Sequence, residues 1–281
     1  MSIVRSFAKN ILIDFKKVYQ RIVWKHQYNK VKTKLVTFVD SKSISSLRIK
    51  KALILCPHAD DEWIGCSSIL SDLSIESTVL YYRMYGYDQS KVNKKTRDRE
   101  LRKCAEKWKF GLTGDGTTTL RYLEESIALH KYDTIFVPSP IDWHWEHRDV
   151  FRGLIDVLKT VHFTDVNILY YYVSVPCIYT TNVFTSVLTH KQQNAKWFFF
   201  EQNYLSQIMP IKRYKLQERI NGTFASSYAA EVFYLASQER LFQDYNMLHE
   251  GNSIQTLNSL KTLINDIYCI RQAANSIIKQ K

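Results

Sequence analysis

Residues 52–62 read ALILCPHADDE, an apolar run that passes directly into a cluster of polar and acidic side chains. A short, continuous apolar run of this kind is typical of a strand that is buried on both faces of a parallel sheet. Ligands of such sheets bind beyond the carboxyl ends of the strands. We therefore expect residues 52–56 to form a buried strand and the polar residues after it to lie at the edge where a site is built.

Three further apolar segments predict strands at residues 77–82, 132–137 and 166–173. A strongly charged helical stretch spans residues 92–109, and another helical run covers residues 148–159. Strands that alternate with helices indicate βαβ units around a mostly parallel sheet. The predicted fold class is therefore α/β, with a Rossmann-like, mostly parallel sheet and flanking helices.

Both ends of the chain have apolar residues at helical spacing. At the N-terminal end they share one face of a helix and are Val4, Phe7, Ile11, Phe15, Val18 and Ile22. At the C-terminal end, apolar residues at the same spacing predict a helix over residues 253–279 that packs on the domain or forms a dimer contact. These residues are Leu257, Leu260, Ile264, Ile267 and Ile270. We thus expect a basic amphipathic extension at 1–50, a central domain at 51–240 and a C-terminal helical segment at 241–281.

The positive charge is concentrated at one end of the chain. Residues 1–51 hold thirteen Lys or Arg and two Asp, so they account for +11 of the formal net charge of +12. A nucleic-acid enzyme usually places its positive charge around the active cleft, whereas the remainder of this chain is nearly neutral. We therefore expect no nucleic-acid partner.

The sequence favours a cytoplasmic location. The five cysteines are scattered and show no CxxC spacing, which argues against a disulfide framework or a cysteine-based zinc site. No uninterrupted apolar stretch of secretory or membrane-spanning type occurs. The basic N-terminal helix leaves two alternatives open. It lies on an anionic membrane, so that the protein is peripheral on the inner membrane face, or it packs on the domain.

The first polar cluster, His58, Asp60, Asp61 and Glu62, directly follows the expected strand at 52–56. Neighbouring carboxylates at a buried position repel one another and lose hydration, and a bound cation relieves both costs. A His and an Asp three residues apart can face one centre where a helix begins. The alternative is a helix N-cap in which an Asp side chain accepts hydrogen bonds from free N–H groups.

The second polar cluster, residues 142–148, follows the expected strand at 132–137. It contains His144 and His147, which are again three residues apart, with Asp142 and Glu146 beside them. Imidazole and carboxylate ligands without thiolates suit a catalytic zinc site that keeps an open position. A ligating histidine also needs a partner for its second ring nitrogen, and Asp142 or Glu146 can serve.

Together the two clusters resemble the signatures of the PIG-L/LmbE family of zinc-dependent N-deacetylases, a PHPDDE-type loop and a later HxDH loop. They stand here as PHADDE at 57–62 and HWEH at 144–147. Weaker matches occur at 97–100, 204–207 and 228–233, so the resemblance covers roughly residues 51–235. It implies an enzyme that uses Zn²⁺ to remove the acetyl group from an N-acetylated amino sugar.

The resemblance also implies roles for individual residues. It makes His58, Asp61 and His147 the zinc ligands, Asp60 the general base, and His144 the group that steadies the oxyanion or protonates the amine. Glu62 becomes a supporting residue rather than a ligand. In two departures from the family pattern, Ala59 replaces a proline, and Glu146 replaces an aspartate expected to orient His144.

Substrate contacts are expected from aromatic and basic residues near the clusters. Trp143 and Trp145 flank the expected site and can stack on a pyranose ring. Arg97 either faces the substrate or forms an ion pair with Glu100. The carrier of the sugar is left open between a lipid, a nucleotide and a thiol precursor. The alternative functions are an amide hydrolase for a non-sugar N-acyl metabolite and a catalytically inactive carbohydrate-binding relative.

Overall fold

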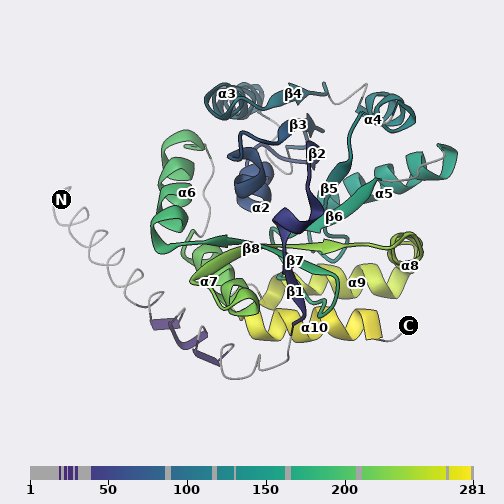
Figure 1. Cartoon of the computed structure of the whole chain (residues 1–281). Helices are drawn as coiled ribbons and strands as arrows, with labels where there is room; N and C mark the ends of the chain where they lie inside the picture. Colours follow the sequence, from purple (N-terminus) through teal and green to yellow (C-terminus); the bar gives the residue numbers. More distant parts are fainter. Residues whose placement is uncertain are drawn as a thin grey trace, which may run out of the picture.

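The computed structural model describes residues 39–85, 90–115, 119–129, 131–161, 166–206, 211–263 and 266–279, together with scattered positions between 19 and 30. An eight-stranded sheet runs through this part of the chain in the order β1-β7-β8-β6-β5-β2-β3-β4 (Figure 1). The strands are β1 (Ser41–Ser43), β2 (Lys51–Cys56), β3 (Glu76–Tyr81), β4 (Gly111–Thr113), β5 (Thr134–Pro138), β6 (Asn167–Tyr171), β7 (Val183–Leu188) and β8 (Ala229–Leu235). Only β8 runs antiparallel to its neighbours in this described sheet, so the predicted α/β, mostly parallel fold class is confirmed.

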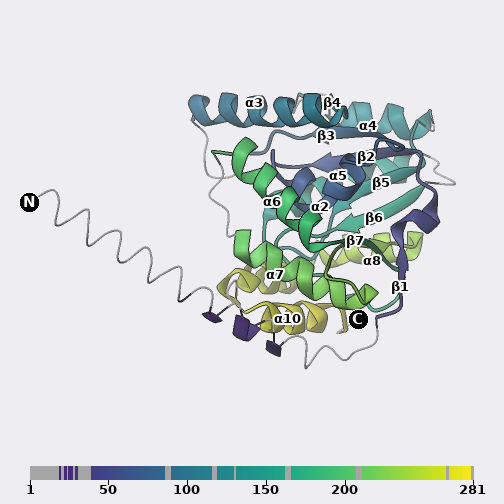
Figure 2. The same ribbon diagram turned by 60° about the vertical axis from the view of Figure 1, so that its left-hand side comes forward.

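Helices cover both faces of the sheet (Figures 1 and 2). One face carries α2 (Asp61–Leu70), α3 (Lys91–Trp108), α6 (His190–Asn203) and α7 (Ile211–Gly222). The other carries α4 (Thr119–Ala128), α5 (Trp145–Thr160), α8 (Gln238–Met247), α9 (Gly251–Ser259) and α10 (Ile267–Lys279). Short 3-10 turns occur at Ile44–Leu47, Thr223–Ala225 and Leu260–Leu263.

Strand β2 lies at the centre of the sheet and separates the two layers of the core. Ala52, Ile54 and Cys56 belong to the core under α2, while Leu53 and Leu55 belong to the core under α5. All five side chains are fully buried. Because successive strand residues point to opposite faces, a strand covered on both sides must be apolar throughout, which explains the unbroken run in the sequence.

The order of the strands places a topological switch point between β2 and β5. From β2 the chain passes outward to β3 and β4, and it then returns to pair β5 with the other edge of β2. Helices that follow β2 and β5 therefore start beside each other at the carboxyl edge of the sheet. In doubly wound folds this crevice is where ligands bind. Both polar clusters of the sequence lie there.

The single C-terminal helix predicted over 253–279 is wrong, because the segment forms α9, a 3-10 turn and α10. Before α10, the Asp266 carboxylate accepts the backbone N–H of Cys269 at 3.0 Å, as an N-cap residue does. The apolar face packs on the domain, which was one of the two alternatives. Its members Leu257, Leu260, Ile267 and Ile270 are buried, and Ile264 lies outside the described residues.

The predicted N-terminal apolar face lies outside the described residues, except for Ile22, which is 63% exposed. Further along, Gln27 is buried, and the ammonium group of Lys30 lies 3.0 Å from the Asp266 carboxylate. Strand β1 falls within the predicted extension at 1–50 and pairs with β7. No helix among the described residues is long and apolar enough to span a membrane.

Candidate metal centre

Three side chains converge at the switch point. One ligand atom from each of His58, Asp61 and His147 lies within 4.8 Å of the others. The Asp61 Oδ2 atom lies 2.9 Å from His58 Nδ1 and 3.4 Å from His147 Nε2. Asp61 and His147 are buried, whereas His58 is partly exposed. Two imidazoles and one carboxylate around a common point form a donor set for a divalent cation.

The local sequence places these donors in the turns that lead into two helices. Asp61 opens α2 directly after the loop that leaves β2, and its carboxylate accepts the backbone N–H of His58 at 3.1 Å. His144 precedes α5, which puts His147 in the first turn of that helix. Each cluster thus uses the turn between a central strand and its helix. The three-residue spacing brings two side chains of one cluster toward the same point.

The charges of the three donors depend on one another. Burial opposes ionisation of Asp61, but the imidazoles of His147 and His58 hold its pKa below the usual range. Burial likewise opposes a charged His147, yet Asp142 and Asp61 raise the pKa of its imidazole well above the usual value. Without a cation, a proton on His147 therefore balances the buried carboxylates. A metal ion would take the place of that positive charge and release the proton.

Asp142 fixes the orientation of His147. Its Oδ2 atom lies 3.0 Å from Nδ1 of His147, and its Oδ1 atom accepts the backbone N–H of His144 at 2.9 Å. Nε2 of His147 is then directed toward Asp61. Of the two carboxylates that the sequence offered for this role, the structure uses Asp142. Within the described chain, the carboxylate of Glu146 hydrogen-bonds neither histidine, and its charge acts on Arg148.

Asp60 lies beside the donors in the loop that leads into α2. Its φ angle of 148° is a conformation that residues with a side chain rarely adopt, and such strain is often found at functional sites. The backbone N–H of Asp60 donates to Oε2 of Glu62 at 2.9 Å, which helps to hold this conformation. Burial, together with the charges of Asp61 and Glu62, raises the pKa of Asp60 well above its usual value. A buried carboxylate with increased proton affinity is suited to act as a general base.

Glu62 holds this loop in place through hydrogen bonds. Its side chain is fully buried and accepts hydrogen bonds from the Tyr204 hydroxyl, the Cys56 thiol and the Asp60 backbone. Burial raises the pKa of Glu62 to about 7, even though the hydrogen bond from Tyr204 favours the ionised form. These contacts place Glu62 behind the donor cluster.

His144 lies beside the donor cluster, directly before α5. Its ring centroid lies 5.0 Å from that of His147 and 6.3 Å from that of His58. Burial lowers the pKa of His144 and favours the neutral ring. A neutral imidazole beside three donors can give or accept a proton, which keeps His144 a candidate for proton transfer.

The predicted substrate contacts differ in accessibility. Trp145, in the first turn of α5, is 55% exposed and available for stacking. Trp143 is 8% exposed and packs in the core, with the guanidinium of Arg213 5.5 Å from its ring centre, so it offers no open platform. Arg97 is partly exposed, and its charge favours ionisation of Asp60. Glu100, its other predicted partner, accepts hydrogen bonds from the backbone and hydroxyl of Ser206 instead.

Helix α7 contributes two residues that the sequence analysis missed. Arg213 is almost fully buried, donates to the backbone oxygen of Ser174 and lies close enough to Asp142 for their charges to interact. Burial raises the pKa of the neighbouring Tyr214, and the charges of Asp60, Asp61 and Asp142 raise it further. Both side chains therefore border the donor cluster. They are distant in sequence from both motifs and follow no spacing that marks a site.

A second buried network supports α2 on the side away from the metal donors. Helix α2 is broken at Cys66, whose φ and ψ of −134° and 24° are non-helical. Glu231 accepts the freed backbone N–H groups of Ser67 and Ser68 at 3.0 and 2.9 Å. The ammonium group of Lys196 donates to the backbone oxygen of Ile64 at 2.7 Å and lies 2.6 Å from Glu231. The break is thus satisfied by one buried ion pair.

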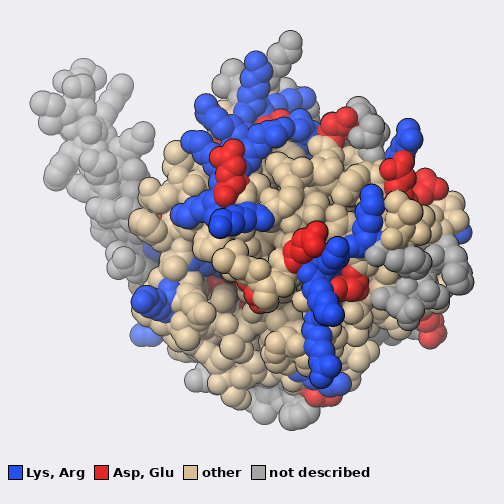
Figure 3. Space-filling view, turned by 45° about the horizontal axis from the view of Figure 1, so that its top comes forward, with Lys and Arg blue, Asp and Glu red and all other residues tan. Residues whose placement is uncertain are grey.

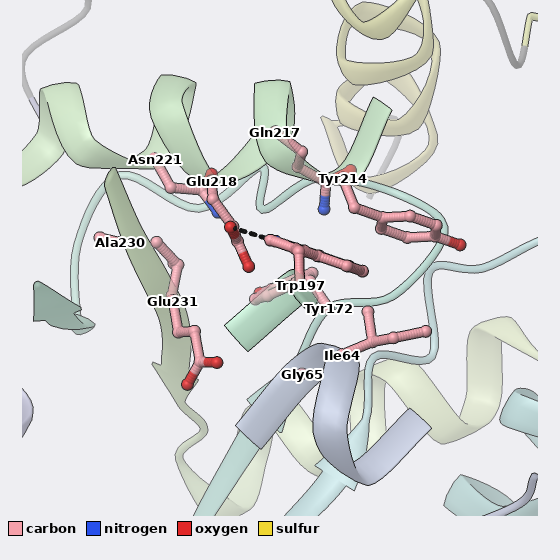
Figure 4. Close-up of a pocket in the computed structure, with 11 residues that line it drawn as sticks. Ile64, Gly65, Tyr172, Trp197, Tyr214, Gln217, Glu218, Asn221, Ala230 and Glu231 are labelled. Carbon is pink, nitrogen blue, oxygen red and sulfur yellow. Dashed lines mark hydrogen bonds between the residues drawn. The ribbon is translucent and has the colours of Figure 1, made fainter. Parts of the chain in front are cut away.

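Figure 4 shows the small cavity beside this network, with Glu218 from α7 and Glu231 from β8 on its walls. Glu218 accepts the indole N–H of Trp197 at 2.8 Å and lies 2.7 Å from the ammonium group of Lys196. The cavity volume of about 20 Å³ is enough for one water molecule. It is therefore too small to be a substrate site.

Comparison with known proteins found similarity to solved structures, but not to family models or to curated sequences. No protein-family model matches the chain, and no curated protein matches its sequence. The conserved protein TT1542 from Thermus thermophilus aligns over 66% of this chain and 94% of its own, with a TM-score of 0.51 and 15% identity. A deacetylase of the teicoplanin biosynthesis pathway, solved in complex with teicoplanin, aligns over 68% of this chain and 100% of its own, with a TM-score of 0.50 and 10% identity. At these identities the similarity establishes a shared α/β fold.

Proposed function

We propose that this chain is a zinc-dependent amidase of the PIG-L/LmbE type that removes the N-acetyl group from an amino sugar. The observation that carries the proposal is the convergence of His58, Asp61 and His147, with Asp60 and His144 beside them. The shared fold with a deacetylase that binds teicoplanin supports the same reaction class. Neither similarity nor fold alone assigns an activity, so the proposal depends on the site.

The residues present fit a zinc ion. Two imidazoles and one carboxylate leave room for a water or a substrate oxygen, which is the ligand set of catalytic rather than structural zinc. The hydrogen bond between Asp142 and His147 Nδ1 leaves Nε2 of His147 for the metal. No cysteine belongs to this cluster among the described residues. Zinc, when bound here, would lower the pKa of a water to about 7 and polarise the amide carbonyl.

The remaining steps fall to the side chains of this chain. The Asp60 carboxylate takes a proton from the attacking water as its oxygen adds to the acetyl carbonyl carbon. The neutral His144 ring donates an N–H hydrogen bond to the resulting oxyanion, or it takes up a proton from the solvent and gives it to the sugar nitrogen as the C–N bond breaks. The products are acetate and the free amino sugar. Proton transfers of this kind each typically contribute two to four orders of magnitude in rate, roughly.

Fewer residues support the proposed choice of substrate than support the proposed reaction. Trp145 offers the exposed aromatic surface on which a sugar ring can stack, and Arg97 brings a positive charge to the edge of the site. The alternative substrate is a non-sugar N-acyl metabolite, and the alternative function is carbohydrate binding without turnover. We favour the deacetylase because the ligands, the base and the second histidine all lie in one place.

Metal analysis combined with a substrate panel tests the proposal. The purified chain should contain about one zinc per molecule, and it should release acetate from an N-acetylhexosamine that is free, nucleotide-linked or lipid-linked. A chelator should abolish the release and added zinc should restore it. Turnover that is insensitive to the chelator would refute metal dependence. Release from non-sugar N-acyl amides alone would favour the alternative substrate, and zinc binding without turnover on any substrate would favour the inactive relative.

A further inference from the structure

Helix α3 presents a stripe of basic residues to solvent. Its exposed positions lie on one side of the helix and comprise five basic residues and one acidic residue, Lys95, Arg99, Arg102, Lys103, Glu106 and Lys107. Figure 3 shows Lys and Arg side chains gathered over this region. None of the five basic residues forms an ion pair within the described chain. The ion pair that α3 does form there joins Asp98 to Arg83. Five cations and one carboxylate leave this face with an excess of positive charge, so it is suited to an anionic partner.

Two large apolar side chains are exposed on the neighbouring helix α6 and directly after it. Phe198 on α6 is 65% exposed, and Leu205, just after the helix, is 76% exposed. Helices α3 and α6 pack together, with the ammonium group of Lys107 4.4 Å from the ring centre of Phe199 (Figures 1 and 2). A groove of about 340 Å³ runs between them and is lined by Arg99, Lys103 and Leu205. We call the five basic residues, Phe198 and Leu205 the α3–α6 surface.

We propose that the α3–α6 surface docks on an anionic lipid bilayer. Lipid phosphates would pair with the basic stripe, while Phe198 and Leu205 would enter the boundary between headgroups and acyl chains. This combination of separate cations and exposed apolar side chains distinguishes a membrane from a nucleic acid, which offers little apolar surface to a leucine. The near neutrality of residues 52–281 as a whole also argues for a local patch rather than a nucleic-acid channel.

The α3–α6 surface lies on segments that also reach the metal centre. Leu205 follows Tyr204, whose hydroxyl group binds Glu62 beneath the donor cluster. Helix α3 also carries Arg97, whose charge acts on Asp60. Docking would therefore hold the metal centre close to the bilayer. If the proposed deacetylase function holds, the substrate class that this arrangement serves is a lipid-linked amino sugar, but docking itself does not depend on that function.

Vesicle flotation with the full-length protein tests the docking. The probes are vesicles of neutral phosphatidylcholine and vesicles that contain about one third phosphatidylglycerol. The charge variant is Arg99→Glu with Lys103→Glu, and its control, Lys191→Glu with Lys261→Glu, makes the same change in net charge at other exposed positions. The apolar variant is Leu205→Ser, and its control is Leu73→Ser, because Leu73 is 74% exposed and lies elsewhere. Circular dichroism checks that each variant folds.

We expect binding to the anionic vesicles only, reduced by high salt. Each basic residue near an anionic surface contributes about fivefold to binding, so the α3 charge variant should bind more than tenfold more weakly than its control. Leu205→Ser should also weaken binding relative to Leu73→Ser. The proposal is overturned if wild-type protein ignores anionic vesicles, or if the variants bind as well as their controls. It is equally overturned if the α3 charge variant loses affinity for a nucleic acid while keeping its affinity for vesicles.

Discussion

Asp142 accepts a hydrogen bond from Nδ1 of His147 at 3.0 Å, and both side chains are almost fully buried. This contact fixes which nitrogen of His147 faces Asp61 and increases the basicity of the ring. We predict that Asp142→Asn weakens zinc affinity by about ten- to a hundredfold, the range typical of such partners. Competition with a chelator measures the change. The exposed Asp149→Asn serves as a control, and equal affinities in the two variants would contradict the role of Asp142.

Replacing the proposed base should separate metal binding from turnover. Asp60→Asn keeps the size of the side chain but cannot take a proton from water, so we predict retained zinc and a loss of about two to four orders of magnitude in kcat. Zinc content and acetate release, measured on the same sample, check both parts. Full activity in this variant would disprove the mechanism, and loss of zinc would move Asp60 into the ligand set.

The sequence predicted the centre of this fold better than its periphery, and the reason is physical. Strand β2 is buried on both faces, so its residues must all be apolar, and the pattern is visible in the sequence alone. The edge strand β1 has three residues, Ser41–Ser43, with no apolar pattern, and it exists because it pairs with β7. Such a strand is determined by distant partners rather than by its own residues.

The same contrast holds at the candidate site. The metal donors could be predicted from the sequence, whereas the residues that border them from α7 could not. His58 and Asp61 lie in one turn, and His147 follows the neighbouring strand, so local motifs and the topology of the sheet were sufficient to bring them together. Arg213 and Tyr214 reach the site from α7, which only tertiary packing positions. Trp143 next to the motif is buried, because residues flanking a site can also fill the core beneath it.

The buried pair between Lys196 and Glu231 should contribute strongly to stability. Glu231→Gln removes the charge that faces Lys196 and places an amide donor opposite the N–H groups of Ser67 and Ser68. Breaking a buried pair typically costs about 3–5 kcal/mol when a charge is left uncompensated. Because Glu218 still lies 2.7 Å from the ammonium group of Lys196, we expect the lower end of this range, which urea denaturation measures as a lower free energy of unfolding. The exposed Glu124→Gln should change this free energy by less than about 0.5 kcal/mol. Similar values for the two variants would show that the pair does not stabilise the break in α2.

Gly65 should not tolerate a side chain. A Cβ atom at this position would lie 2.3 Å from the ring of Tyr171, whose hydroxyl group is itself held by the backbone oxygen of Leu55. We predict that Gly65→Ala lowers the free energy of unfolding by about 1–3 kcal/mol, the usual cost of overpacking. Gly251→Ala is the matched control, since a Cβ there meets nothing within 4 Å. Equal stability of both variants would mean that α2 moves away from β6 without cost.

Residues 1–18 can be removed without disturbing the contacts that the N-terminal segment makes with the domain further along the chain. Lys30 reaches Asp266 and lies 5.2 Å from the ring centre of Tyr268, and Val39 is buried. A deletion of residues 1–18 therefore keeps these contacts and β1, while it removes five of the six residues of the predicted apolar face. We predict that this deletion leaves the melting temperature and the turnover of a soluble substrate unchanged.

The same deletion should weaken flotation with anionic vesicles, because it removes five residues of the apolar face predicted from the sequence together with a net charge of +3. A basic residue near an anionic bilayer gains about 1 kcal/mol, and buried apolar side chains add to this. The loss should add to that of the α3 charge variant if the two segments act independently. A deleted protein that melts at a lower temperature and floats as well as the full chain would show instead that residues 1–18 belong to the fold.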